Sequence, residues 1–280
     1  MTAFQILLPA FVASLILTGI HAYLGVHVVE RGVIFVDLSL AQIAALGTTV
    51  AYLAGYDLHT GFGAYFFSLG FTFVGAAIFA FTRSRHRTRI PQEAIIGIVY
   101  AVSAAVAILV MSKATQETEH LKEMLVGNIL SVTWPELAKT ALLYALVGVF
   151  HFVFRRKFLL ISLDEPEAER QGLNVRLWDL LFYMSFGFVV TSSVAIAGVL
   201  LVFCFLIVPS VAAMLFSERL GVRLAIGWTM GALVSAGGVA LSFVLDLPTG
   251  ATIVATFGGT LLLLAAYRAL FFRPAAAVVN

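Results

Sequence analysis

The chain has 280 residues, of which 61% are hydrophobic and 11% are charged, and its mean hydropathy is +1.02. Soluble domains carry a charge on about 25% of their residues, so this composition excludes an ordinary soluble protein and indicates an integral membrane protein. The net charge of +2 gives no indication of a nucleic-acid partner. The single cysteine, Cys204, excludes an intramolecular disulfide and a cysteine-based zinc cluster.

Nine apolar runs are long enough to cross about 30 Å of hydrocarbon. In chain order they cover residues 4–29, 33–55, 62–82, 93–111, 137–154, 177–193, 195–216, 224–245 and 251–272. No Lys or Arg precedes the first run, which is longer than about 20 residues, so we interpret it as a span and not as a cleaved signal peptide. The sixth and seventh runs are nearly continuous, which leaves open nine spans or eight spans with a partly re-entrant segment. The sequence therefore predicts an all-α, polytopic helix bundle of eight to nine spans.

Two features inside these runs concern helix packing. Pro209 lies in the seventh run, where it is expected to kink or break a helix. Irregular backbone at membrane depth must be covered by protein or water, so we expect this segment to face the bundle interior. In the eighth run, Gly227 and Gly231 have the spacing that lets two helices approach closely.

The polar segment 155–178 separates the fifth and sixth runs and contains a short helix signal. Asp164 is a good N-cap, and Glu167, three residues later, completes a capping box. The carboxylates of Glu165 and Glu167 suit the positive end of a helix dipole, and Gly172 is a natural stop. This predicts a helix of about two turns, roughly 10 Å long. Because such a helix is too short to be stable alone, it should dock on another surface, although a capped surface loop is the alternative.

This D-E-P-E-A-x-x-x-G pattern resembles the cytoplasmic coupling loop of the metal-ion ABC transporter permeases, the membrane subunits of zinc, manganese and iron importers. Further stretches resemble the same family, in order and at fitting intervals: Gln92–Ile98, Leu125–Leu130, Gly198–Pro209 and Leu247–Ala251. The resemblance implies a type II ABC importer permease, with residues 1–280 forming one transmembrane domain.

The resemblance also implies roles for individual residues and partners. Coupling to the ATPase is expected of Asp164, Glu165, Glu167, Ala168 and Gly172, and gating or structural roles are expected of Gly198, Pro209, Pro248 and Gly250. The expected partners are two copies of an ABC ATPase, an extracytoplasmic metal-binding protein, a second permease that is identical or paralogous, and the lipid of a bacterial inner membrane. The chain has no G-x-x-x-x-G-K-[ST] motif. We therefore expect no enzymatic activity and no bound cofactor, with ATP on the partner subunit.

The distribution of positive charge predicts the orientation. If residues 155–178 are cytoplasmic, nine spans place the N-terminus outside and the C-terminus inside. Of the 17 Lys and Arg residues, 14 are then cytoplasmic, and only Lys113, Lys122 and Lys139 are outside. This asymmetry is the one that cytoplasmic loops normally have. We interpret the cluster Arg83–Arg89 as a headgroup anchor, with a nucleotide or partner site as the alternative.

The second run departs from the family pattern. Permeases of this family carry F-x-G-D-A-L-S-H-A-x-x-P-G, in which Asp and His, at i and i+4, share one helix face and can meet one metal ion. Here Leu38 takes the aspartate position and Gln42 the histidine position, and Asp37 is displaced by one residue. That displacement turns the carboxylate by about 100° around the helix. Asp37 and Gln42 therefore cannot form the family's pair from one ideal helix.

We nevertheless name Asp37, His21 and Gln42 as candidate metal-pathway residues, since neutral imidazole is a common ligand of transition metals. The alternatives are an ion pair of Asp37 with Arg31, a helix-to-helix hydrogen bond from Gln42, and a satisfied interior histidine at position 21. Two other histidines, His27 and His151, are interpreted as interfacial.

Two polar features outside the second run need an interpretation. Glu93 is explained as a partner of its own helix dipole. The external segment 113–123, with Glu117, Glu119, His120 and Glu123, is interpreted as a seat for the binding protein, with metal capture as the alternative.

Three rival functions remain to be weighed. An ion-driven secondary transporter would need carboxylates in the membrane, and apart from Asp37 the chain offers almost none. An intramembrane enzyme is disfavoured because no H-E-x-x-H or G-x-S-x-G motif occurs. A third rival keeps the ABC mechanism but carries a metal chelate or siderophore. The sequence does not decide between a bare ion and a chelate.

Overall fold

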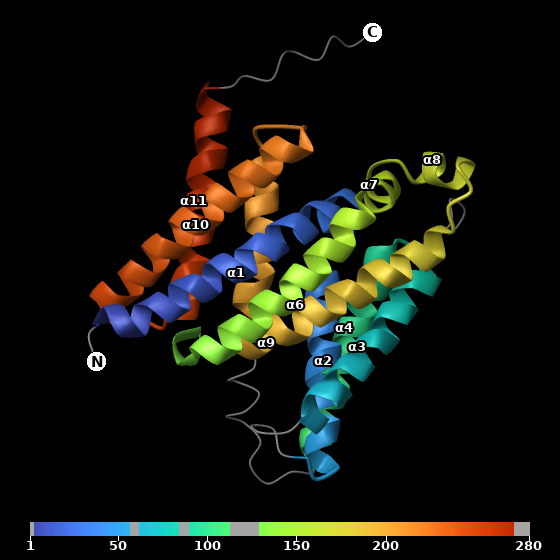
Figure 1. The fold of residues 1–280 in the computed structure, drawn as a ribbon, viewed down its shortest axis with the longest axis horizontal. Helices are drawn as coiled ribbons and strands as arrows, with labels where there is room; N and C mark the ends of the chain where they lie inside the picture. The colour runs from blue at the N-terminus through green and yellow to red at the C-terminus, as the bar shows by residue number, and fades with distance from the viewer. Residues whose placement is uncertain (1–2, 57–61, 84–89, 113–128, 272–280) are drawn as a thin grey trace.

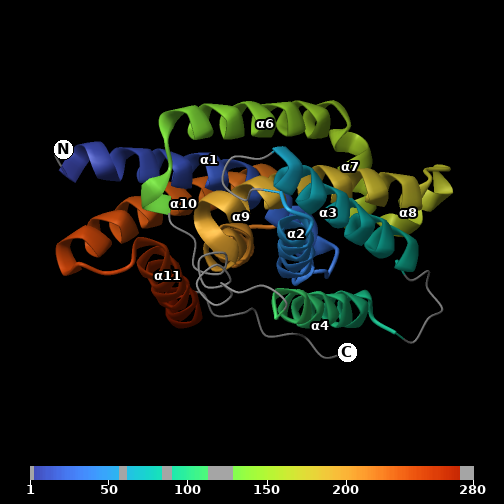
Figure 2. The same cartoon turned by 90° about the horizontal axis from the view of Figure 1, so that it is seen from below.

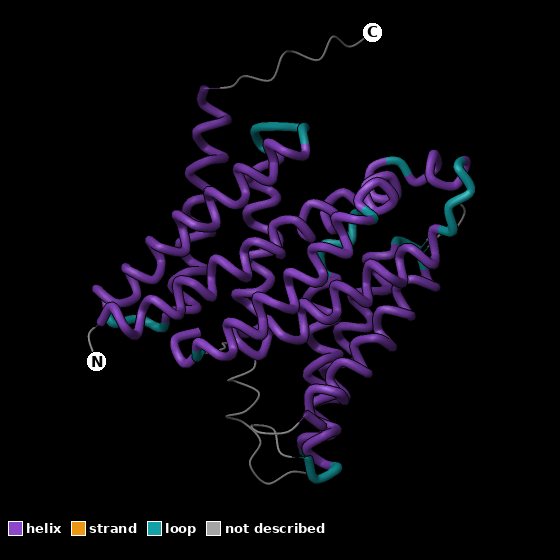
Figure 3. The backbone as a smooth tube through the Cα atoms, viewed as in Figure 1, coloured by secondary structure: helices purple, strands orange, loops and turns teal. Residues whose placement is uncertain are grey.

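A computed structural model of the protein describes residues 3–56, 62–83, 90–112 and 129–271. All regular structure in these residues is helical, as Figure 3 shows, so the predicted all-α class is confirmed. The helices are α1 (Ala3–Glu30), α2 (Val36–Leu53), α3 (Phe62–Thr82), α4 (Gln92–Met111), the 3₁₀ turn η1 (Ile129–Ser131), α6 (Trp134–Val153), α7 (Arg155–Leu163), α8 (Glu165–Arg170), α9 (Val175–Met214), α10 (Leu220–Leu245) and α11 (Thr249–Phe271).

Eight helices of the described part are long and apolar enough to cross a membrane: α1, α2, α3, α4, α6, α9, α10 and α11. With 40 residues, α9 would be about 60 Å long if it were straight, twice the thickness of the hydrocarbon core. Both of its ends nevertheless lie beside the C-terminal end of α1. Asp179, near its start, pairs with Arg31, and Arg223, shortly after its end, pairs with Glu30. The chain of α9 must therefore reverse direction.

The reversal occurs at Gly198, whose φ of 75° and ψ of 163° are non-helical. This backbone conformation is essentially restricted to glycine. It divides α9 into residues 175–197 and 199–214, which Figure 1 shows running in opposite senses. These two helical segments correspond to the two nearly continuous apolar runs and are called the first and second pass of α9. The helix does not break at Pro209, because the chain turns at Gly198 instead. Pro209 is buried within the second pass, so the expectation that its segment faces the bundle interior is confirmed.

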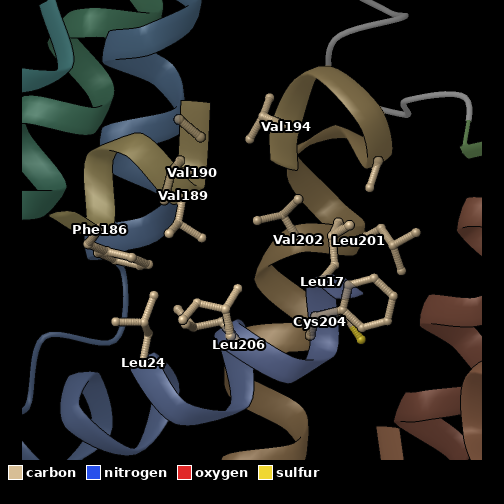
Figure 4. Packing of buried hydrophobic residues seen from close by; sticks show 14 of the residues in the cluster. Leu17, Leu24, Phe186, Val189, Val190, Val194, Leu201, Val202, Cys204 and Leu206 are labelled. Atoms are coloured by element: carbon tan, nitrogen blue, oxygen red, sulfur yellow. The ribbon is translucent and has the colours of Figure 1, made fainter. Parts of the chain in front are cut away.

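The helices form layers around α1 and α9. In Figure 2, α6 lies along one face of the molecule and α4 along the opposite face, with α1, α9 and α2 between them. α9 packs against α1, α2, α3, α10 and α11, and so joins the two sides of the bundle. Figure 4 shows Leu24 of α1 near Phe186 of the first pass and Leu206 of the second. The buried apolar core lies here.

Small residues allow the closest helix contacts. A Cβ added to Gly25 of α1 would collide with the carbonyl oxygen of Leu206, so α1 and the second pass of α9 meet backbone to backbone. A Cβ at Gly231 of α10 would collide with Thr18 of α1, and one at Gly227 would lie 3.5 Å from Ala22. The close helix contact predicted from the spacing of Gly227 and Gly231 is confirmed, and its partner is α1.

We predict that Gly198→Ala destabilises the protein by about 1–3 kcal/mol, because the backbone of an alanine is strained in this conformation. The thermal unfolding of the purified, detergent-solubilised variant measures the effect. Gly148→Ala is the matched control, since Gly148 lies in α6 and an added Cβ there would have no atom within 4 Å. The control should be neutral or stabilised by up to about 1 kcal/mol. Equal unfolding temperatures for Gly198→Ala and the parent would show that the reversal tolerates a side chain.

Candidate functional site

The N-terminus of α2 holds the acidic side chain expected in the second run. Asp37 is fully buried in the first turn, and neither of its carboxylate oxygens has a hydrogen-bond partner among the residues described. The expected partner Arg31 is bound elsewhere, to Asp179, so the proposed Arg31–Asp37 pair is wrong. The nearby end of α4 contributes Glu93, which accepts a 2.9 Å hydrogen bond from the backbone N–H of Phe35. Glu93 therefore supports the start of α2 as well as lying in the first turn of α4.

The other two candidate metal residues do not join Asp37 in one cluster. Gln42 is only partly buried, on the same helix as Asp37. His21 is fully buried in α1, with Nδ1 2.7 Å from the carbonyl oxygen of Leu17. Both α1 and α2 pack against α9. In the described ranges, no three His, Cys, Asp or Glu side chains gather as a metal site. Metal binding by these residues stays a prediction.

The predicted short helix of the 155–178 segment is present as α8. The Asp164 side chain accepts a 3.0 Å bond from the N–H of Glu167, as an N-cap should, and Gly172 follows the helix with a φ of 75°. The Glu167 carboxylate binds Gln171 at 2.8 Å and Arg170 at 3.0 Å, instead of returning to the cap as the expected capping box requires. Sequence reasoning missed α7, which continues directly from α6.

Two contacts dock α8 on the bundle. Ala168 is fully buried and packs with Ile161 of α7 and Val175 of α9 in a small apolar cluster. Glu165 forms a 2.8 Å ion pair with Arg83 at the end of α3. Beside these contacts is a pocket of about 700 Å³, lined by residues of α8, the start of α9 and the end of α3. The sequence prediction that this short helix docks on another surface is confirmed within the chain.

A buried ionic network extends from α8 into the bundle. Arg83 binds Glu165 at 2.8 Å and Asp179 at 2.6 Å, and Asp179 in turn binds Arg31 at 2.7 Å. The side chains of Arg31 and Asp179 are 1% and 0% exposed, so these charges are compensated by one another and not by water. The network joins the ends of α1 and α3 to α8 and the first pass of α9.

The charge balance of this network keeps both arginines protonated. Burial lowers the pKa of the Arg31 guanidinium, and the Asp179 carboxylate opposes that effect. Burial also acts to lower the pKa of Arg83, but Asp179 and Glu165 raise it on balance. A guanidinium keeps its proton throughout the physiological range.

Sequence reasoning missed several of these residues. Asp179 is a second carboxylate within an apolar run, whereas the sequence analysis had named only Asp37 as a carboxylate inside the membrane. Asp179 lies at the start of the run 177–193, directly after the polar segment 155–178, and the sequence analysis assigned it no role. His27 and His151 had been interpreted as interfacial, but both are 1% exposed and lie inside the bundle, because α7 folds back over them. Their only sequence signal is that both occur near the ends of apolar runs, His27 in the run 4–29 and His151 in the run 137–154.

The remaining expected sites have mixed outcomes. Gly198 lies at the reversal of α9, and Pro248 precedes α11, where its carbonyl accepts from the N–H of Thr252. Gly250 lies in the first turn of that helix. The arginine cluster from residue 84 to 89, the acidic segment 113–123 and the stretch 125–128 lie outside the described residues.

Comparison with known proteins identifies the family. Residues 3–268 match the ABC 3 transport family. The chain belongs to that family. It is 26% identical to the manganese transport system membrane protein MntC of Listeria innocua, over 88% of this chain and 84% of the relative. It is also 27% identical to the chelated iron transport system membrane protein YfeC of Yersinia pestis, over 97% and 87% of the two chains.

The same fold occurs in a solved protein structure. PsaBC from Streptococcus pneumoniae, solved in complex with Fab, superimposes with a TM-score of 0.76 at 23% identity, covering 97% of this chain and 93% of the other. At this identity the likeness shows the fold alone. Membership of the ABC 3 transport family makes the chain a multi-span membrane permease subunit, which works with an ATPase and a substrate-binding protein as separate subunits.

We predict that Asp179→Asn destabilises this permease by about 3–5 kcal/mol, because it leaves two buried guanidinium groups without their shared counter-charge. Thermal unfolding of the purified variant measures the loss. Glu169→Gln, an exposed substitution on α8, is the control and should change stability by less than about 0.5 kcal/mol. If the two variants unfold alike, the Asp179 pairs do not stabilise the structure.

Proposed function

We propose that the chain is the membrane-spanning permease of a binding-protein-dependent ABC importer for divalent transition-metal ions, with manganese and iron favoured and zinc as a further candidate. The observation that carries this is α8, a capped six-residue helix held at the end of the bundle by Ala168 and by the Arg83–Glu165 pair. A helix of this length has little stability of its own. A short helix kept ordered and partly exposed suits a surface on which a separate ATPase acts.

The ionic network provides a path for that action. A displacement of α8 pulls on Glu165, and through it on Arg83, Asp179 and Arg31. A buried charge that loses its partner carries a desolvation cost. The C-terminal ends of α1 and α3 and the start of α9 should therefore move together with α8. ATP binding and hydrolysis on two partner ATPases would thereby drive alternating access of the permease.

The permease is proposed to act as a dimer with an identical or paralogous copy, with the pathway at the interface on a two-fold axis. In the membrane, the end of the bundle that carries α7 and α8 is proposed to be cytoplasmic. The excess of Lys and Arg on this side supports that orientation, which puts the N-terminus outside and the C-terminus inside.

The substrate is proposed to be a bare ion, and a metal chelate is the alternative. Asp37 supports the bare ion, because a buried carboxylate without a hydrogen-bond partner among the described residues is suited to receive a cation. The changed family motif of α2 and the relative named for chelated iron favour the chelate. A chelate would be bound through its organic groups and would not need Asp37.

We predict that Glu167→Lys abolishes metal uptake. The substitution reverses a charge in the first turn of α8, against the helix dipole, and removes the contacts to Arg170 and Gln171. Uptake by cells and co-purification of the ATPase are the measurements. Glu218→Lys reverses an exposed charge in the turn before α10 and is the matched control, with uptake close to that of the parent. An unchanged amount of bound ATPase together with fully active uptake in Glu167→Lys would refute the coupling role of α8.

We predict that Asp37→Ala slows uptake more than Gln42→Ala does, with His21→Ala intermediate. At low external metal, where capture limits the flux, Asp37→Ala should reduce uptake by roughly tenfold, which corresponds to about 1.4 kcal/mol of binding. Radiotracer uptake over a range of metal concentrations measures this. If all three variants match the parent at every concentration while the Glu167→Lys result holds, the residues are structural and the chelate function gains support.

The orientation can be measured with single cysteines, because the natural Cys204 is buried and should not react. Glu169→Cys in α8 should react with a membrane-impermeant maleimide only after the membrane is opened. Leu247→Cys, exposed between α10 and α11, should react in intact cells. Labelling of both positions from the same side would contradict the proposed topology.

A further inference from the structure

Three polar aromatic side chains meet in a buried cluster where α1, α6 and α7 come together. The ring centroids of Tyr23 and His27 are 4.8 Å apart, those of Tyr23 and His151 5.5 Å, and those of the two histidines 6.4 Å. Both histidines are 1% exposed. The cluster lies at the α7 end of the bundle and is distinct from the Asp37 region of α2.

The hydrogen bonds around His27 determine which of its ring nitrogens carries the proton. The Ser162 hydroxyl donates its hydrogen to the carbonyl oxygen of Phe158 at 2.8 Å. The hydroxyl oxygen can therefore only accept from His27 Nδ1, which lies 2.8 Å away. Nδ1 of His27 thus carries the hydrogen, and Nε2 keeps a free lone pair.

The same argument applies to His151 with a different serine. The Ser185 hydroxyl donates to the carbonyl oxygen of Phe182 at 2.8 Å, so its oxygen accepts from His151 Nε2, also at 2.8 Å. His151 Nε2 carries the hydrogen, and Nδ1 keeps the lone pair. Two independent serines therefore hold two neutral imidazoles in the tautomers that leave one bare nitrogen on each ring.

The bare nitrogens are not used by the described part of the protein. His27 Nε2, His151 Nδ1 and the hydroxyl of Tyr23 are all buried and have no hydrogen-bond partner among the described residues. Leaving a buried polar atom unpaired costs about 1–3 kcal/mol, so three in one cluster point to a ligand that satisfies them together. Neutral imidazole with its second nitrogen bonded outward is the usual form of a metal-binding histidine.

The cluster is bordered by the Arg31 guanidinium and by apolar rings. Arg31 also donates to Ser162, at 2.8 Å, and its positive charge belongs to a network that is neutral as a whole, with Arg31 and Arg83 balanced by Asp179 and Glu165. Phe158 stacks on His151 with centroids 4.4 Å apart, and Phe182 lies 5.7 Å from His27, so apolar rings cover the imidazoles. Nitrogen ligands in such surroundings select borderline transition metals such as Zn²⁺ and Co²⁺ over Mg²⁺ or Ca²⁺, which prefer oxygen.

We propose that Tyr23, His27 and His151 form a binding site for one divalent transition-metal ion, with Ser162 and Ser185 as positioning residues. The site is separate from the pathway residues of α2, and it does not require that the permease carry a bare ion. Because Ser162 belongs to α7 and contacts both His27 and Arg31, an ion bound here acts directly on the segment that leads into α8. The other occupant that would fit the same three atoms is a water molecule, which donates to both nitrogens and accepts from Tyr23.

The test uses the purified full-length permease in detergent, titrated with Co²⁺ and then with Zn²⁺. One equivalent of Co²⁺ should give the visible absorption of a nitrogen-ligated site, and Zn²⁺ should displace it. His27→Gln and His151→Gln should each abolish the absorption or weaken Co²⁺ binding by about 100-fold. Ser185→Ala keeps both ligands but frees the His151 tautomer, and should weaken binding by about 10-fold, with recovery in Ser185→Thr.

The matched control is Ser14→Ala, which changes a fully buried polar side chain of α1 outside the cluster and should bind Co²⁺ as the parent does. Gel filtration checks that each variant is folded, and only folded variants are compared. If the parent binds no stoichiometric Co²⁺, the cluster holds water and the proposal is overturned. It is also overturned if folded His27→Gln and His151→Gln both retain the absorption of the parent. Failure of metal uptake by cells would bear on the proposed transport function and leave this binding result intact.

Discussion

The α7–α8 end of the structure depends on the ion pairs that the Asp179 carboxylate forms. This carboxylate is fully buried and pairs with two arginines that come from the ends of different helices, Arg31 after α1 and Arg83 after α3. Taking each of these ions out of water costs several kcal/mol unless a partner is held in good geometry. Moving any one of these helix ends away from the others would leave a buried charge without its partner. The helix ends therefore form one unit, and Glu165 adds α8 to it through Arg83.

A second constraint acts within the membrane, where apolar burial alone does little to bring helices together, because lipid tails are as apolar as the side chains. The bundle instead uses close backbone approach at small residues. Gly25 lets α1 touch the second pass of α9, and Gly231 lets α10 touch α1 at Thr18. The reversal at Gly198 is what makes this arrangement possible, because it returns α9 along α1 and gives α1 a partner from each pass.

Two kinds of potential metal-ligand group are buried at different places in this bundle. On α2, Asp37 offers oxygen ligands, which accept hard and borderline cations and are suited to a site that an ion must also leave. Between α1 and α6, His27 and His151 offer nitrogen ligands held by serines, an arrangement suited to firmer binding of softer ions. The position of the histidines beside α7 links them to the segment that contacts the ATPase in the proposed mechanism. Transport and the response to bound metal would thus depend on different ligand sets.

The sequence by itself determined the class of protein, the apolar runs and the short helix of the coupling segment. These depend on local chemistry: hydropathy over about 20 residues, the cap at Asp164, and Gly172 after the helix. The family could also be inferred, because its motifs are contiguous in the chain. Sequence spacing even indicated that Asp37 and Gln42 cannot share one helix face, since a single helix has a fixed periodicity.

Only the tertiary structure decided which distant side chains meet. Arg31 pairs with Asp179, 148 positions away, and not with Asp37, because the turn after α1 directs its side chain toward α9. His27 and His151 looked interfacial from their places at the ends of runs, but α7 covers them, and no local pattern encodes that fold-back. The site of the chain reversal likewise required coordinates, since proline is the usual sequence signal of a break and here a glycine conformation makes the turn. Local rules act over a few residues, whereas these contacts are set by how whole helices pack.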